Sequence, residues 1–295
     1  MTTRGIRKPG IYTLTSSRYF ADPVVRPSLN HSVLRLLLDK SPMHARAAHP
    51  RLSPELVEKE PSDAMLAGTV LHRLILGRGE TIRIVEETSW RGKAAASAWD
   101  EAMEAGEVPI LAHKFAELRK CADAVVAQLR ADPEAASFFA PGKSEAIAIA
   151  RVGPVWLRCM VDRLPDAEGA PLWDLKSTGQ SARPADWERS LANRHATQAA
   201  FYRWVVGTAL KRPVGEMRFA VFERDPPYAV SIVSPGETMM DAAEAEVRKG
   251  IEMWARCMVM DDWPGYGRGV HRIEAPVHML ARAEAAKLDF GRMAA

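Results

Sequence analysis

The hydrophobic pattern of this chain changes at Glu145, and that change limits the folds it can adopt. Before Glu145, apolar residues recur every three or four positions, which predicts a mostly helical first half. We expect helices over residues 28–40, 63–77, 94–104 and 110–131. After Glu145, short apolar or alternating runs separated by turn residues predict a meander of three strands. These runs span residues 145–152, 155–162 and 172–177.

The rest of the chain predicts two long helices and one more hairpin. The helices are expected over 184–210 and 236–259, and the hairpin over 217–223 and 228–233. Helices, three strands, a helix, two strands and a final helix together favour an α/β fold, with a central mixed sheet flanked by helices.

The two ends of the chain differ from its middle in composition and in hydrophobic periodicity. Residues 1–26 are rich in Pro, Arg, Ser and Thr without a steady period, which indicates an arm that either docks on the body or stays mobile. We expect one domain over residues 27–262. The tail, residues 263–295, begins with turn-forming and aromatic residues and is expected to pack on the body.

Composition excludes several classes of protein. Forty Lys and Arg against 37 Asp and Glu give a net charge of only +3, so the chain is not polybasic. Its three cysteines form no C-x-x-C pair, which argues against disulfides, zinc and iron-sulfur clusters and favours a reducing, cytoplasmic setting. No signal sequence or membrane span is indicated. The phosphate-binding glycine motifs of nucleotide-driven motors and dinucleotide enzymes are missing too.

Two aspartates and a lysine carry the chemistry. Asp162 ends the second expected strand and Asp174 lies in the third, so a turn centred near Glu168 places the two carboxylates opposite one another, with Cβ atoms roughly 5 Å apart. Carboxylates this close repel unless a cation lies between them, which points to a hard divalent metal. Lys176 follows Asp174 by two residues and shares its face of the sheet.

Carboxylates, a metal and an ammonium group together suit hydrolysis of a phosphodiester. The metal lowers the pKa of a bound water and neutralises charge on the phosphorane. The lysine can orient that water or stabilise the charged oxygens. Two carboxylates favour Mg²⁺, whereas an imidazole ligand also tolerates Mn²⁺.

These residues resemble the signature of the PD-(D/E)xK nuclease superfamily, Asp162 followed by Asp174-Leu175-Lys176. Gly68 to His72 is similar to the Gly-x-x-x-His helix, and Gln198 to Tyr202 to the Gln-x-x-x-Tyr helix, of its exonuclease branch. Two amino-terminal segments further resemble the exodeoxyribonuclease VIII group of prophages. They are Tyr19-Phe20-Ala21-Asp22 and Lys40-Ser41-Pro42-Met43-His44, so the similarity covers residues 19–262.

The resemblance implies a restriction-endonuclease-like core and a metal held by Asp162, Asp174, His72 and the backbone carbonyl of Leu175. Lys176 would then position the attacking water. The backbone at Gly68, four residues before His72, is expected to come close to the sheet.

The resemblance assigns less direct roles to three other residues, and spacing suggests a fourth. Gln198 and Tyr202, on one helical face, would contact the DNA backbone or steady the site. Glu145 would bind a second metal or hydrogen-bond Lys176. The family commonly has an aromatic residue shortly before the Gln, which is absent here. Arg194, four residues before Gln198, is a candidate phosphate ligand instead.

The function expected is a metal-dependent exonuclease acting on linear double-stranded DNA in phage-type recombination. Resemblance alone implies 5′ to 3′ polarity, a homo-oligomer and a single-strand annealing protein as partner. Two alternatives stay open. One is a non-catalytic DNA-binding or assembly protein of the same fold, and the other is an endonuclease or repair nuclease of the superfamily.

Overall fold

A computed structural model describes residues 5–55 and 62–293. The chain divides into two compact units, Met1–Trp263 and Pro264–Ala295. The second unit contains the helix α11 (Val277–Met293), and the side chains of Val277, Met279 and Leu280 on it are exposed. In the part of the chain that the structure describes, no helix has the length and apolar character that crossing a bilayer requires. The extents expected for arm, domain and tail remain predictions.

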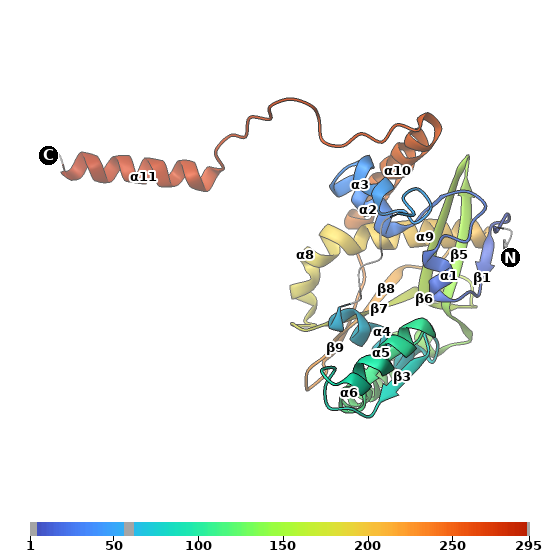
Figure 1. The fold of residues 1–295 in the computed structure, drawn as a ribbon. Helices are drawn as coiled ribbons and strands as arrows, with labels where there is room; N and C mark the ends of the chain where they lie inside the picture. The colour runs from blue at the N-terminus through green and yellow to red at the C-terminus, as the bar shows by residue number, and fades with distance from the viewer. Residues whose placement is uncertain (1–4, 56–61, 294–295) are drawn as a thin grey trace. The chain divides into compact units, whose positions relative to one another are not determined.

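A seven-stranded mixed sheet forms the centre of the first unit (Figure 1). Its strands are β1 (Gly10–Tyr12), β2 (Ser28–Leu29), β5 (Gly142–Val152), β6 (Val155–Pro165), β7 (Leu172–Thr178), β8 (Met217–Glu223) and β9 (Val230–Val233). The order is β1-β5-β6-β7-β8-β9, with β2 paired to the first half of β6. Strands β5, β6 and β7 form the predicted antiparallel meander, and β8 and β9 the predicted hairpin. Strand β8 pairs in parallel with β7.

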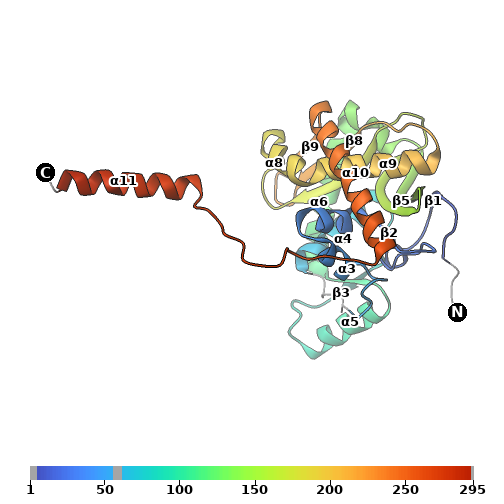
Figure 2. The same ribbon diagram turned by 90° about the horizontal axis from the view of Figure 1, so that it is seen from above.

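Helices cover both faces of this sheet. On one face pack α2 (His31–Asp39), α9 (Ala196–Leu210) and α10 (Glu237–Met260), around a core that includes Leu34, Phe201 and Trp254. Figure 2 shows α10 crossing α9 on this side. On the other face, α4 (Asp63–Leu76) and α6 (Ala112–Ala131) pack around Leu71 and Leu175. The prediction of an α/β fold with a flanked central sheet is therefore confirmed.

Local signals in the sequence set the ends of the first helices. The Asn30 side chain accepts a hydrogen bond from the Val33 amide and caps α2. Ser62 caps α4 in the same way. Helix α4 ends at Gly77, whose φ of 67° is the left-handed conformation that favours glycine.

The remaining elements are short and lie mostly in connections. They are α1 (Ser16–Phe20), α3 (Pro42–Ala47), β3 (Ile82–Val85), α5 (Lys93–Glu104), β4 (Val108–Leu111), η1 (Pro133–Ala135), α7 (Ala136–Phe139), η2 (Pro184–Trp187), α8 (Glu188–Ser190) and η3 (Leu191–His195).

The structure differs from the expected elements in several places, among them the short elements β1, α1 and β2 near the amino terminus. Strands β3 and β4 form a separate parallel pair that the sequence did not predict. Because β4 runs directly into α6, its apolar residues extend the helical pattern and hide the strand. The polar stretch after residue 40 contains α3. The helix expected over 184–210 is continuous only from Ala196, because a 3₁₀ turn and the π-helical segment η3 precede it.

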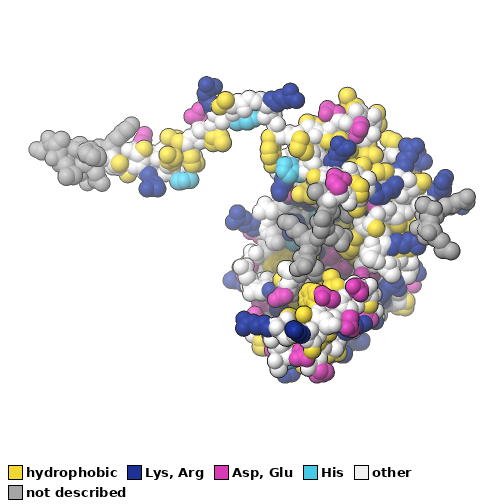
Figure 3. Space-filling view, viewed as in Figure 1, with side chains coloured by type: hydrophobic (Ala, Val, Ile, Leu, Met, Phe, Trp, Pro, Cys, Tyr) yellow, Lys and Arg dark blue, Asp and Glu magenta, His cyan; other side chains and the backbone are white. Residues whose placement is uncertain are grey.

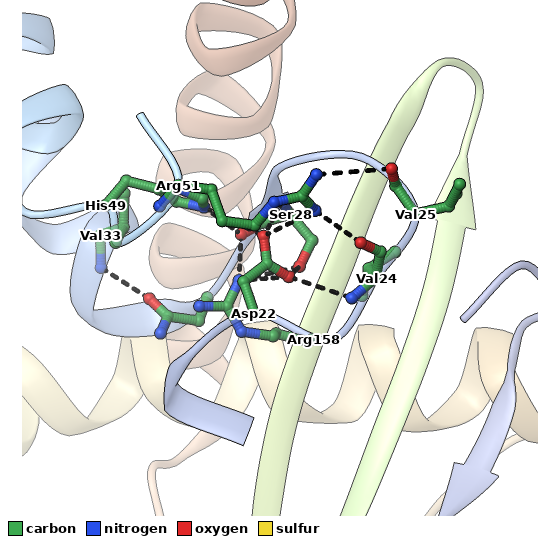
Figure 4. Close-up of polar contacts among 9 residues, drawn as sticks. Asp22, Val24, Val25, Ser28, Val33, His49, Arg51 and Arg158 are labelled. Carbon is green, nitrogen blue, oxygen red and sulfur yellow. Dashed lines mark hydrogen bonds and ion pairs between the residues drawn. The ribbon is translucent and has the colours of Figure 1, made fainter. Parts of the chain in front are cut away.

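The amino-terminal segment is fastened to the body by β1 and by a buried polar cluster (Figure 4). We call Asp22, Ser28, His49, Arg51 and Arg158 the arm cluster. Asp22, His49 and Arg158 are each no more than 4% exposed. The cluster joins the chain after α1, the loop after α3 and strand β6.

Candidate active site

The two aspartates lie where neighbouring strands separate. Strands β6 and β7 share a single paired position, Arg163 opposite Trp173, and this register places Asp162 across from Asp174, as expected. The other end of β6 pairs with β2, so the edge of β6 is divided between two neighbours. Asp162 is 6% and Asp174 4% exposed. Two buried carboxylates therefore meet at the point where the sheet opens.

Asp162 has fewer partners than its burial demands. Its Oδ2 accepts a hydrogen bond of 2.7 Å from the Leu175 amide and lies 3.6 Å from Nδ1 of His72. Burial, and after it the charge of Asp174, raises the pKa of Asp162 to about 6. A positive charge placed between the carboxylates would offset both the cost of burying the Asp162 charge and its repulsion by Asp174.

Asp174 is held by two side chains. Lys176 forms an ion pair with its Oδ1, and Nε2 of Gln198 donates a hydrogen bond of 2.7 Å to its Oδ2. The Lys176 ammonium also lies over the Phe219 ring, 5.6 Å from its centroid. The structure thus brings together residues from β6, β7, α4 and α9, on both sides of the sheet.

His195 is a site residue that the sequence did not reveal. Its Nδ1 lies 3.2 Å from Oε1 of Gln198, and its ring stacks on Trp187 with centroids 5.6 Å apart. Burial, then the Lys176 charge, lowers the pKa of His195 to about 4, so the ring is neutral near pH 7. Because the Gln198 amide nitrogen donates to Asp174, its oxygen accepts from Nδ1–H. The spacing of three residues from Gln198 was the available signal.

Tyr202 and Arg194 occupy different surroundings. Tyr202, one turn after Gln198, is partly buried against the core, and burial raises its pKa well above the usual value. Its ring meets that of His31 edge-on, with centroids 6.4 Å apart. Arg194 lies in η3 and is exposed, whereas Gln198 is buried. Because Arg194 belongs to the π-helical segment η3 and Gln198 to α9, regular α-helical spacing does not relate the two side chains.

Glu145 lies beside the aspartates in the sheet but faces another neighbour. Its φ of 49° interrupts the β5–β6 ladder between Ser144 and Ala146, at the position opposite Asp162. A Cβ added to Gly79 would lie 3.0 Å from its Oε1, so the carboxylate adjoins the loop after α4. Burial raises the pKa of Glu145, and the charge of His72 opposes this. The Lys176 ammonium pairs with Asp174 instead.

The expected reason for the approach of His72, a close contact at Gly68, is wrong. No described atom lies within 4 Å of a Cβ added at Gly68, so this glycine does not allow a close contact with the sheet. His72 reaches Asp162 because α4 packs on that face through Leu71 and Ile75.

The donor set fits a hard divalent cation. Two carboxylates that repel one another, an imidazole at their edge and a nearby backbone carbonyl are the ligand types that Mg²⁺ and Mn²⁺ accept. Within residues 5–55 and 62–293, no three His, Cys, Asp or Glu side chains are arranged as a metal site. The oxygens of Asp174 are turned toward Lys176 and Gln198.

The meander, the parallel strand β8 and the opposed aspartates define a PD-(D/E)xK-like fold. The family model of a "PDDEXK-like domain of unknown function (DUF3799)" matches residues 31–275. The chain belongs to this family, so the predicted superfamily is confirmed. A crystal structure described as a "putative exonuclease" from Eubacterium rectale is similar in fold, with a TM-score of 0.57 at 13% identity. That match covers 90% of this chain and 97% of the other. The comparison with curated proteins found no match.

Proposed function

We propose that this protein is a metal-dependent deoxyribonuclease that degrades linear double-stranded DNA from an end. The observation that carries the proposal is the register of β6 and β7, which opposes Asp162 and Asp174 and sets Lys176 beside them. The PDDEXK-like family supports a nuclease.

Each polar group of the site would have a separate task. Asp162, Asp174, His72 and the Leu175 carbonyl would hold the cation. When bound, the cation would supply charge neutralisation and a water of lowered pKa. Lys176 would orient the attacking water or stabilise the charged phosphate oxygens. Gln198 holds Oδ2 of Asp174 in a fixed direction, and His195 fixes the Gln198 amide. Glu145 is the candidate for a second cation.

Attack from a DNA end is supported by the Gln-x-x-x-Tyr and Gly-x-x-x-His resemblances and by the description of the Eubacterium rectale protein as a "putative exonuclease". From the same resemblance we propose 5′ to 3′ polarity and a part in phage-type recombination. It also implies a homo-oligomer and a single-strand annealing protein as partner. The three cysteines are unpaired, which suits a cytoplasmic location.

The test compares linear and closed-circular plasmid DNA, with Mg²⁺, with Mn²⁺ and with a chelator. We expect the linear form alone to be degraded, and only with a metal. Labels at each end of a duplex report the polarity. Degradation of circular DNA would make the protein an endonuclease, and DNA binding without any cleavage would make it a non-catalytic member of the fold.

A variant pair links that activity to the site. Lys176→Ala should abolish cleavage without unfolding the protein, because Lys176 is partly exposed and its loss leaves the core intact. Lys249→Ala removes the same charge from the exposed surface of α10 and should cleave normally. Full cleavage by the Lys176 variant contradicts the proposed site.

A further inference from the structure

A polar pocket adjoins the candidate site through Glu145. It has a volume of about 540 Å³ and lies between the amino-terminal segment, the end of α4 and strand β5. We call it the arginine pocket. Its charged and hydroxyl lining includes Thr13, Thr15, Arg18, Arg73, Arg78, Glu80 and Glu145, so three arginines face two carboxylates. None of the proposed catalytic roles uses its arginines.

Glu145 and α4 connect this pocket to the aspartates. Glu145 lines the pocket and occupies the position opposite Asp162 in the β5–β6 register. Arg73 lines it too and directly follows His72, whose ring lies 3.6 Å from Asp162. A group bound in the pocket would therefore be a close neighbour of one bound at the aspartates.

The pocket offers the donors that a phosphate group accepts. Guanidinium groups give paired hydrogen bonds to phosphate oxygens, and hydroxyl groups add single ones. Arg73 already donates to the Gly79 carbonyl at 3.3 Å, which fixes it as part of the wall. Arg18 is exposed and Arg78 half-buried. Neither lies within ion-pair distance of a described carboxylate, although the charges of Arg78 and Arg73 oppose the rise in the pKa of Glu145. Arg18 and Arg78 therefore keep hydrogen-bond donors for an anion.

The amino-terminal wall of the pocket is held in place. Strand β1 pairs with β5 just before Thr13, and Tyr19, just after Arg18, is buried with its ring 5.6 Å from the Arg158 guanidinium. Asp22 then binds the body through the arm cluster. Lys and Arg side chains are also frequent on the side of the molecule where β1 and α1 lie (Figure 3).

We propose that the arginine pocket binds a phosphate group of the DNA strand that is cleaved at the aspartates. This rests on the proposed function for the identity of the strand. The phosphate has two sources, the monoester at a 5′ end and a diester within the backbone. The same donors serve both, because each presents charged, unesterified oxygens.

The experiment measures binding of fluorescent duplexes by anisotropy with a chelator present, so that no cleavage occurs. Arg18→Ala and Arg78→Ala should each weaken binding about tenfold, in the range of a lost charged hydrogen bond. Each should also lower the salt dependence of binding by about one phosphate contact. Arg256→Ala removes an exposed arginine of α10, on the other face of the sheet, and should change binding less than twofold. Arg78→Lys should restore part of the affinity.

Duplexes with a 5′-phosphate and with a 5′-hydroxyl distinguish the sources. If the parent prefers the phosphorylated duplex and the variants lose that preference, the pocket binds the terminal monoester. If the variants weaken both duplexes equally, it binds a backbone diester. Variants that bind both duplexes like the parent overturn the inference, and so does a parent that binds neither, since these donors need no metal. If the arginines prove necessary for DNA binding but the protein does not cleave DNA when a metal is added, the proposed nuclease function is wrong and the inference about the pocket stands.

Discussion

Strand β6 carries two buried ionic groups four residues apart, and they are compensated to very different degrees. Arg158 belongs to the arm cluster, where it is 1% exposed, and Asp162 belongs to the candidate site, where it is 6% exposed. Each pairs with groups from distant parts of the chain. The carboxylate in the arm cluster is Asp22, the partner of Arg158, and it has more partners than Asp162 has.

In the arm cluster, both oxygens of Asp22 are bound several times (Figure 4). Its Oδ1 accepts from the Ser28 hydroxyl at 2.6 Å and faces Arg158 at 3.3 Å. Its Oδ2 accepts from the Ser28 amide at 2.9 Å and lies 3.3 Å from His49. Burial alone would raise the pKa of Asp22, but the His49 hydrogen bond, the Arg158 charge and Ser28 outweigh it and lower the pKa.

At the candidate site the pKa shift has the opposite direction. Burial and the neighbouring Asp174 raise the pKa of Asp162 to about 6, and one amide and one imidazole do not offset them. A fully compensated carboxylate holds a structure together, whereas an undercompensated one is a place for an added cation. The comparison therefore predicts that the two carboxylates respond oppositely to substitution.

The largest effect is expected from Asp22→Asn. The amide keeps the shape of the side chain but leaves Arg158 buried without its counter-charge. Breaking a buried pair in this way costs about 3–5 kcal/mol of unfolding free energy. Urea unfolding monitored by tryptophan fluorescence measures it. Asp39→Asn, at the exposed end of the Arg35 pair, is the control and should change stability by less than about 1 kcal/mol.

Asp174→Asn is expected to act on activity and not on folding. Gln198 can still donate to the remaining oxygen, but the cation ligand and the partner of Lys176 are lost. Cleavage of linear duplex should fall about 100-fold to 1,000-fold, the scale of a lost electrostatic group in an active site. The urea midpoint should move little. If Asp174→Asn lowers the unfolding free energy as much as Asp22→Asn does, Asp174 is a structural residue and the two clusters do not differ in role.

Asp162→Asn should stabilise the protein when a chelator is present and the pH is near 7.5. A carboxyl whose pKa is raised on folding contributes stability below its unfolded pKa of about 3.9, and that contribution is lost as the pH rises to about 6. Removing the charge should therefore add about 3 kcal/mol at pH 7.5, where both states are otherwise ionised, and nothing below pH 4.

The pH dependence of the two clusters sharpens this prediction. The pKa of Asp22 is lowered on folding, so its contribution is present above about pH 4 and is lost as the pH falls. Urea midpoints between pH 3.5 and 7.5 should show both trends in the parent protein. Mg²⁺ at pH 7.5 should remove the advantage of Asp162→Asn, because the cation offsets the same repulsion. An advantage that persists unchanged in metal contradicts a cation site there.

The centre of the candidate site could be predicted because short-range patterns determine it. A turn centred near Glu168 follows from the two flanking runs, and the observed pairing of Arg163 with Trp173 has that centre. The same holds for the end of α4 at Gly77, which depends on a single residue. Alternation and capping are local properties, so the sequence shows them directly.

The supporting groups could not be predicted, because contacts between distant residues create them. Ser28 and Arg158 meet across 130 positions, on strands whose parallel pairing has no local signal. His195 lies three residues before Gln198, but its stacking on Trp187 and its contact with the Gln198 amide depend on how the π-helical segment η3 packs. The sequence showed Asp22 as part of a resemblance to a family, but not as the centre of a buried cluster.

The smallest effect is expected from Ser28→Ala, which removes one hydroxyl from the arm cluster. That hydroxyl donates to Asp22 at 2.6 Å and accepts from Arg158 at 2.8 Å, while the Ser28 amide and His49 continue to bind Asp22. Because the charges remain paired, the loss should be about 1–2 kcal/mol, the net value of the two hydrogen bonds that the hydroxyl makes. A double variant with Asp22→Asn should lose less than the sum of the two single variants, since both remove the same bond. Strict additivity in urea unfolding would show that the cluster does not act as a unit, and the contrast with the candidate site would then depend on Arg158 alone.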